Sequence, residues 1–335
     1  MKRDKYIIAI LCGIAIILLF LIIRPNLVAP AKETPGQPLP ASPKVVESNQ
    51  LVFDLKYHQY LVPYPYTYTY KGETRRFEFV KMLNHATKAK EESTKGRLTY
   101  ISNYKDRNGM APLYRGKSAD ADGTLRGAAA PAYWGLDNLE DFDYLPDGTL
   151  VRILETSLGS NKDFTKIYSI ADQREYFVPS KWIALNRQLE TIEKVILVDL
   201  TNQTIAALEN NIRMSYYDES GVYLRTEWDI VSYSKCTTGK LGYYHQPTPK
   251  GYFYAMEKKP FFYYLVDGTD QIGGQEPWGI RFTAGAYVHG MSLGEYSPAI
   301  GTIPLSHKCV RNYTSHAKFL YDWYEEDRTI VIVMD

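Results

Sequence analysis

The sequence has little imbalance of charge and few cysteines. Lysine and arginine number 39 against 38 acidic residues, which gives a formal net charge of +1 at pH 7. This near-equal number of positive and negative charges argues against the strongly basic surface of a nucleic-acid-binding protein. The 45% of apolar residues argue against disorder. The 335 residues include only three cysteines, Cys12, Cys236 and Cys309. Thiol chemistry is therefore restricted to three positions.

Tyrosine is the residue type in clear excess. The chain has 29 tyrosines against 12 phenylalanines. A tyrosine ring packs on a half-buried strand while its hydroxyl stays solvated, so this bias favours β structure and a polar groove. The length is enough for two ordinary domains.

An apolar run at the N-terminus predicts a membrane anchor. Residues 6–23 contain no charge and would span ~27 Å as a helix, close to the thickness of a bilayer core. Lys2, Arg3 and Lys5 precede the run, so we expect residues 1–24 to form a cytoplasmic start and a single-pass inner-membrane helix, with the rest of the chain in the periplasm. A cleavable signal peptide is the alternative.

The segment that follows contains a spacer and a first globular region. Residues 25–49 hold six prolines and predict an extended linker. Within 50–188 we expect a helix at 73–92, then short alternating strands separated by Gly, Asp and Asn turns, at 146–157, 164–170 and 174–185. Such strands suit a small β-barrel, and the last two resemble the end of bacterial SH3-like domains, at about 110–188.

The second region, 194–335, reads as mainly β. Residues 194–210 comprise two apolar segments around a polar turn and predict a hairpin. One helix is expected at 314–324, where apolar side chains recur at helical spacing. Further strands are predicted at 221–235, 252–257, 285–289 and 329–334.

Cys309 lies in the segment "SHKCVRN" and has two opposed interpretations. Outside the cytoplasm, a Cys236–Cys309 disulfide or two buried thiols are plausible. A catalytic thiolate instead needs a base and a positive environment that lowers its pKa. His307, Lys308 and Arg311 would provide that environment, but local charge alone does not decide between the two.

A candidate base lies upstream. His289 closes an apolar strand and Gly290 follows it, a usual position for a catalytic side chain. His289 would accept the thiol proton, and the Gly290 carbonyl would fix its tautomer. Backbone N–H groups around His307, Lys308 and Cys309 would then bind an oxyanion.

These segments resemble the L,D-transpeptidase catalytic domain, a family of peptidoglycan cross-linking enzymes. The family signature is His-Gly, about fifteen residues, and then Ser/Thr-His-Gly-Cys, an apolar residue, and Asn or Arg. Here His289-Gly290 is followed sixteen residues on by "SHKCVR" at 306–311. The Thr-Thr-Gly turn at 237–239, "TPKG" at 248–251 and "ILVDLTNQTI" at 196–205 match further family segments.

The resemblance implies a fold, a reaction and a set of roles. The fold is a β-sandwich-like catalytic domain with a short helix after the cysteine, and the enzyme is a cysteine-dependent acyltransferase that needs no metal or cofactor. Its partners are stem peptides: the cysteine displaces the terminal D-alanine, and an amine or water resolves the thioester. By position, the implied roles are Cys309 as nucleophile, His289 as general base, Gly290 as its orienter, His307 and the Lys308 N–H as lining, and Ser306 and Arg311 as substrate-binding residues.

Lys308 departs from the family pattern, which has glycine at this position. A positive φ here would cost about 1 kcal/mol or more with lysine, whereas an ordinary φ would cost nothing and add a cation beside Cys309. Two rival interpretations follow: an inactive wall-binding protein of the same fold, and a metal site formed by His289, His307 and Cys309.

Overall fold

The computed structural model describes residues 67–335 except 190, 218–222, 241, 243–245, 267–268 and 293–298. The described residues lie within one compact unit, Asn49–Asp335. The predicted anchor and linker, within residues 1–49, lie outside the described residues. Among the helices that are described, none is long and apolar enough to cross a membrane.

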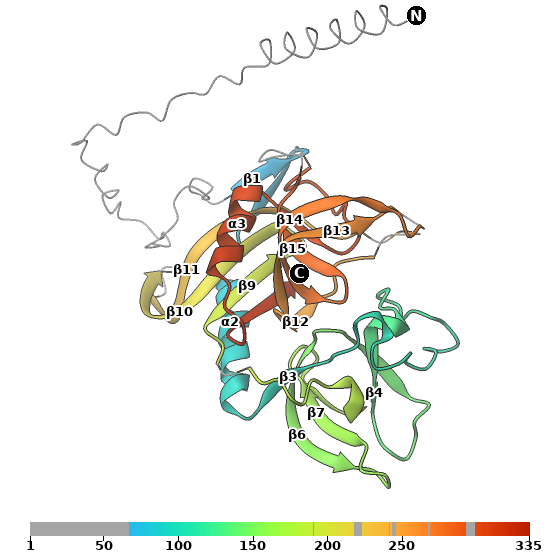
Figure 1. Cartoon of the computed structure of the whole chain (residues 1–335). Coiled ribbons are helices and arrows are strands. Elements are labelled where there is room, and N and C mark those ends of the chain that lie inside the picture. The colour runs from blue at the N-terminus through green and yellow to red at the C-terminus, as the bar shows by residue number, and fades with distance from the viewer. Residues whose placement is uncertain are drawn as a thin grey trace, which may run out of the picture. The chain divides into compact units, whose positions relative to one another are not determined.

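A nine-stranded sheet forms the C-terminal half of the chain, in the order β12-β17-β9-β10-β11-β16-β15-β14-β13 (Figure 1). Only two neighbouring pairs are parallel, β17 with β9 and β15 with β16. The second pair sets Val288 opposite Val310 and His289 opposite Arg311. The strands are β9 Lys194–Asp199, β10 Thr204–Tyr217, β11 Tyr223–Thr237, β12 Gly251–Tyr254, β13 Glu257–Leu265, β14 Ile272–Thr283, β15 Ala286–His289, β16 Val310–Asn312 and β17 Thr329–Met334.

Most predicted elements of this half are confirmed. The hairpin at 194–210 is β9 and β10, and the helix at 314–324 is α3, Thr314–Trp323. The antiparallel hairpin of β13 and β14 was not predicted. Its sequence contains Pro260, Gly273, Gly274 and Pro277, and proline and glycine weaken the strand signal because the first lacks a donor and the second lacks a side chain to pack.

A six-stranded antiparallel sheet precedes the larger one, in the order β3-β6-β7-β8-β4-β5 (Figure 1). The predicted strands at 146–157, 164–170 and 174–185 correspond to β6, β7 and β8. That this sheet forms an SH3-like β-barrel stays a prediction. The strands are β3 Leu98–Tyr100, β4 Ala129–Tyr133, β5 Phe142–Pro146, β6 Leu150–Leu158, β7 Phe164–Ser169 and β8 Arg174–Pro179.

The helix predicted at 73–92 is shifted to α2, Phe79–Thr94. Residues Glu73–Arg76 instead form β2, which pairs with β1, Thr67–Tyr70. The buried face of α2 belongs to the same core as side chains of β9, β10 and β11. Although the sequence places it in the first region, α2 therefore packs against the larger sheet; its buried apolar residues are Phe79, Met82, Leu83, Ala86 and Ala89.

The turn at 147–149 joins the two sheets. The Asp147 carboxylate accepts hydrogen bonds from the backbone N–H groups of Asn103 (2.8 Å) and Ala284 (3.0 Å). Gly148 has φ +84°, and a Cβ there would lie 2.0 Å from the Phe282 carbonyl oxygen. Only glycine permits both the conformation and the approach. The turn at 147–149 of the smaller sheet is therefore attached to residues 282–284 of the larger sheet, immediately before β15.

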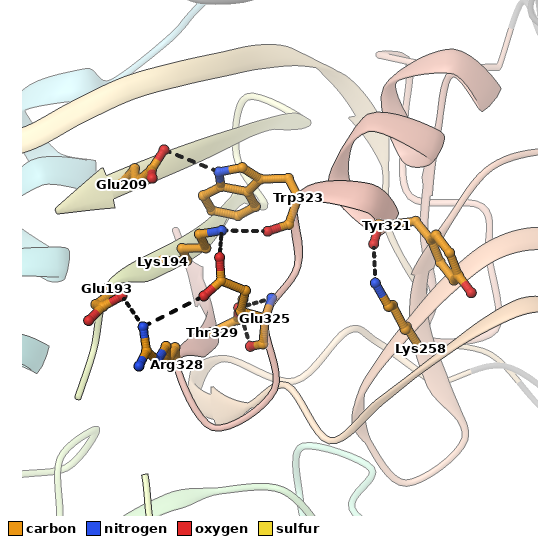
Figure 2. Close-up of polar contacts among 9 residues, drawn as sticks. All are labelled: Glu193, Lys194, Glu209, Lys258, Tyr321, Trp323, Glu325, Arg328 and Thr329. Atoms are coloured by element: carbon orange, nitrogen blue, oxygen red, sulfur yellow. Dashed lines mark hydrogen bonds and ion pairs between the residues drawn. The ribbon is translucent and has the colours of Figure 1, made fainter. Parts of the chain in front are cut away.

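Polar contacts fix the C-terminal end of α3 (Figure 2). The buried Lys194 ammonium donates to the Trp323 carbonyl (2.8 Å) and pairs with Glu325, while the Trp323 indole N–H donates to Glu209 (3.4 Å). A buried ammonium is tolerated only when such partners replace its water. At the other end of α3, the Thr314 hydroxyl donates to the Met291 carbonyl (2.8 Å). Helix α3 therefore holds the segment that follows His289.

Candidate active site

The Cys309 thiol lies at the start of β16, beside the first residues of β15. Its sulfur accepts the backbone N–H of Tyr287 (3.4 Å) and lies 3.9 Å from the Gly285 carbonyl oxygen. Cys309 and His289 both line a cleft of about 1100 Å³. Sequence analysis predicted that these two residues meet, and the parallel pairing of β15 with β16 brings them to one site.

The tautomer of His289 is set by Gly290. The ring is 2% exposed, and its Nδ1 lies 2.5 Å from the Gly290 carbonyl oxygen. Because a carbonyl only accepts, Nδ1 carries the proton, and Nε2 of the neutral ring is the basic nitrogen. Burial lowers the pKa of His289 to about 4; the Gly290 bond opposes this shift and Arg311 adds to it. The ring is therefore neutral at pH 7.

The electrostatics of Cys309 differ from those predicted. Burial raises the pKa of the thiol, and the Tyr287 N–H, Arg311 and Lys308 only partly offset that effect. The predicted net lowering by neighbouring cations is therefore wrong in direction, because loss of water around a thiolate outweighs them. A protonated Cys309 needs a base to become a nucleophile, which makes the neutral His289 more important.

The loop before Cys309 is held by the two upstream motifs. The Gly239 N–H donates to the Thr248 hydroxyl, which donates to the Lys308 carbonyl, both at 2.8 Å. A Cβ at Gly239 would lie 2.6 Å from the Lys308 Cα, so this position requires glycine. Ser306 is fully buried and its hydroxyl donates to the Cys309 carbonyl (2.5 Å). The Ser306 hydroxyl is thus used within the loop, and substrate binding by Ser306 stays a prediction.

Lys308 adopts a backbone conformation that favours glycine. The sequence left open whether φ at this position is positive or ordinary. Its value is +129°, so the lysine backbone is strained. Burial lowers the pKa of its ammonium to about 8, while Cys309, Asp120 and Asp147 oppose that shift. Lys308 therefore lowers the free energy of unfolding through both its strained backbone and its buried ammonium.

Lys308→Gly is expected to stabilise the fold relative to Lys308→Ala. Both variants remove the ammonium, but alanine keeps a Cβ at positive φ. The glycine variant should have the higher free energy of unfolding by about 1 kcal/mol, measured by denaturant titration. A glycine variant no more stable than the alanine variant would show that φ at this position carries no strain.

The remaining predicted residues surround the cleft. His307 is exposed and Arg311 is partly buried, and both line the cleft. The Arg311 Nε is buried without a hydrogen-bond partner among the residues that the structure describes. A buried guanidinium nitrogen without a partner suits an anionic ligand, as predicted for a substrate carboxylate.

The alternatives for the cysteines were a disulfide and a metal site. Cys236 and Cys309 are both free thiols. Cys236 is fully buried on β11, opposite Asn312 of β16, and burial raises its pKa well above the usual value. Across residues 67–335, outside the gaps named above, no three His, Cys, Asp or Glu side chains are grouped to hold a metal ion.

Sequence reasoning missed several residues that shape the cleft. Phe262 of β13 stacks on Tyr287 with ring centroids 4.2 Å apart, and meets His289 edge-on at 5.1 Å. The aromatic run at 261–264 was the available signal. Tyr104 and Lys105 of the first region also line the cleft, and no local pattern in the sequence indicates this.

Comparisons with known proteins point to one family. Residues 193–333 match the family model of the L,D-transpeptidase catalytic domain. No curated protein sequence matches the chain.

Similar solved structures include an L,D-transpeptidase from Mycobacterium smegmatis, with 16% identity and a TM-score of 0.33 over 55% of this chain and 77% of that one. Another is the catalytic domain of an Enterococcus faecium L,D-transpeptidase, with 20% identity and a TM-score of 0.30 over 43% and 99%. A third, from Mycobacterium tuberculosis, has 19% identity and a TM-score of 0.31 over 62% and 77%.

Proposed function

We propose that this chain, whose residues 193–333 belong to the L,D-transpeptidase catalytic domain family, cross-links peptidoglycan stem peptides through a thioester on Cys309. The observation that carries the proposal is the placement of a neutral His289 and the Cys309 thiol in one cleft by the parallel pair β15–β16. Both residues occupy the motif positions of the family.

Acylation begins with proton transfer. His289 Nε2 takes the thiol proton while Nδ1–H stays bonded to the Gly290 carbonyl. The Tyr287 N–H, which already points at the sulfur, stabilises the thiolate as it forms. The sulfur attacks the carbonyl carbon that precedes the terminal D-alanine, the C–N bond breaks, and D-alanine leaves with the proton from His289. Backbone N–H groups of the loop at 307–309 are the candidate oxyanion donors.

Deacylation decides the product. An amine of a second stem peptide gives a cross-link, and water gives a shortened stem as a carboxypeptidase side reaction. In both cases His289 accepts a proton from the attacking group and returns it to the sulfur. Arg311, whose Nε has no partner among the described residues, is proposed to bind a carboxylate of the donor peptide.

The proposed location follows from the N-terminal sequence. An uncharged run of eighteen residues at 6–23, preceded by basic residues, supports an anchor in the inner membrane with the catalytic region in the periplasm. Peptidoglycan lies in that compartment. The location and the anchor are proposals from sequence, since residues 1–66 lie outside the described part of the chain.

The function is tested with a disaccharide tetrapeptide that ends in D-alanine. Full-length protein in detergent should release D-alanine and produce a peptide dimer, both read by mass spectrometry. The same substrate ending in L-alanine is the matched control and should remain intact. A folded protein that leaves both substrates unchanged would instead support the inactive wall-binding alternative.

A further inference from the structure

A second cavity adjoins the catalytic cleft, on the side of the first region. It has a volume of about 490 Å³, and its walls are mostly apolar. Tyr104 and Lys105 line both the cavity and the catalytic cleft, so the two spaces are neighbours. Apart from Ala284, every lining residue comes from the segment 104–128 rather than from the larger sheet.

The cavity begins close to the nucleophile. The Cys309 sulfur lies 3.9 Å from the Gly285 carbonyl oxygen, and the preceding residue, Ala284, is part of the cavity wall. A Cβ built at Gly285 would lie 3.7 Å from the Tyr104 hydroxyl. That is an ordinary contact distance, so the Tyr104 ring lies beside the chain at Gly285, next to the thiol. A ligand held in the cavity is therefore within reach of a group bound to Cys309.

The walls of the cavity are fixed by contacts that cross between the two regions. Asp147 bonds to the Asn103 N–H, the Ala284 N–H and the Arg281 guanidinium. The same Arg281 lies 4.9 Å from the centre of the Tyr104 ring. Such shared, buried partners hold a binding site in one geometry before its ligand arrives.

Two strained backbone positions lie where the cavity meets the cleft. Lys105 has φ +53° and Asp106 has φ +46°, two successive non-glycine residues in the left-handed region. Each such residue costs about 1 kcal/mol or more, and such strain is typical of ligand-binding segments. The conformation places the Lys105 and Asp106 side chains beside the cavity, and neither forms an ion pair with another described residue.

We propose that this cavity is a second substrate subsite, built by the first region, which binds the acyl acceptor. The inference rests on the proposed function. The acceptor that fits is a peptide side chain with an aliphatic stem, a primary amine and a carboxylate. Its stem would lie against Met110 and Leu125, which are 56% and 43% exposed, and Lys105 at the junction would bind the carboxylate.

The subsite explains how an amine competes with water. The amine nitrogen, guided from the cavity, attacks the thioester carbon and forms the C–N bond. The C–S bond breaks, and its electron pair goes to the Cys309 sulfur. One amine proton passes to His289 Nε2 and then to the sulfur, which restores the thiol. Holding the amine beside the thioester raises its effective concentration over that of a free amine.

The test compares two leucines of similar exposure. Leu125, 43% exposed, lines the cavity, and Leu139, 45% exposed, lines neither the cavity nor the catalytic cleft. Leu125→Glu puts a carboxylate into an apolar wall, so we expect the ratio of dimer to hydrolysed tripeptide to fall about ten-fold or more. D-alanine release in the first turnover should stay within about two-fold of wild type, because acylation does not use the cavity, and Leu139→Glu should change neither readout.

A second variant tests whether the effect of Leu125→Glu comes from loss of the cavity rather than from the added charge. A Cβ at Gly127 would lie 3.5 Å from the Met110 sulfur, an ordinary contact, so Gly127→Leu should fill the cavity without a charge and lower the same ratio. Normal D-alanine release with an unchanged ratio in both variants would overturn the acceptor subsite alone. Equal loss of release and dimer would assign the cavity to the donor and overturn it as well. No release by the wild type would contradict the proposed function itself.

Discussion

Cys309→Ala is expected to abolish both D-alanine release and dimer formation, with a loss of at least about 10⁴-fold. Without the sulfur no thioester forms, and His289 has no nucleophile to deprotonate. The fold should survive, because the hydrogen-bond contacts of the sulfur within the described part of the chain are limited to the Tyr287 N–H and the Gly285 carbonyl, and the residue is not fully buried. The measurement is the rate of D-alanine release, with the free energy of unfolding measured in parallel.

The chain supplies its own control for that variant. Cys236 is a second free thiol, fully buried on β11 and bonded through its backbone N–H to the Gln203 carbonyl. Cys236→Ala should lower stability through lost core packing, by about 1–2 kcal/mol, yet retain D-alanine release. Loss of release in Cys236→Ala with normal release in Cys309→Ala would reverse the assignment of the nucleophile.

His289→Ala is expected to lower the rate of acylation by about 10³-fold or more. The reason is specific to this site: burial raises the pKa of Cys309, so the thiol is protonated at neutral pH and needs a base. His85→Ala is a suitable control, since the His85 ring contacts the Tyr252 hydroxyl (2.7 Å) and lies outside the cleft. The control should acylate at nearly the wild-type rate.

The pH dependence of acylation distinguishes this base from an ordinary histidine. With a pKa of about 4, His289 is neutral above that pH and protonated below it. Acylation should therefore fall as the pH drops through about 4, and stay nearly constant from about pH 5.5 to 8. Half-maximal acylation near the usual histidine pKa of 6.5 would show that the ring is solvated in the working enzyme.

The lowered pKa of His289 also makes the free energy of unfolding decrease as the pH falls. In the unfolded chain His289 has the ordinary pKa of 6.5. Between about pH 6.5 and 4, the ring is therefore protonated in the unfolded state and neutral in the folded state. The contribution of the neutral ring to the free energy of unfolding is complete above pH 6.5 and decreases as the pH falls from 6.5 to 4. His316, also fully buried with its pKa lowered to about 3, adds to the same decline.

Local pattern predicted the elements but not how they meet. Alternation around a polar turn identified β9 and β10, and helical spacing identified α3, because these signals depend only on near neighbours. A helix was also expected at 73–92, close to α2. The sequence did not show that α2 packs against β9, β10 and β11, since a local pattern does not specify a distant partner.

The same distinction applies to the site. The motif placed His289 and Cys309 together, but their adjacency depends on the parallel pairing of β15 with β16, which joins segments about twenty residues apart. The expected direction of the Cys309 pKa was wrong, because the charges of Lys308 and Arg311 are visible in the sequence while burial is not. Tyr104 reaches the cleft because contacts such as those of Asp147 attach the first region to the larger sheet, and no local signal reveals them.

The central claim is that Cys309 carries the acyl group. The most direct measurement is the mass of the intact protein after brief mixing with the D-alanine-terminated tetrapeptide, followed by peptide mapping. We predict an adduct equal to the donor peptide minus D-alanine, located on the peptide that contains Cys309 and absent from Cys309→Ala. An adduct on another residue, or D-alanine release that persists in Cys309→Ala, would contradict the account.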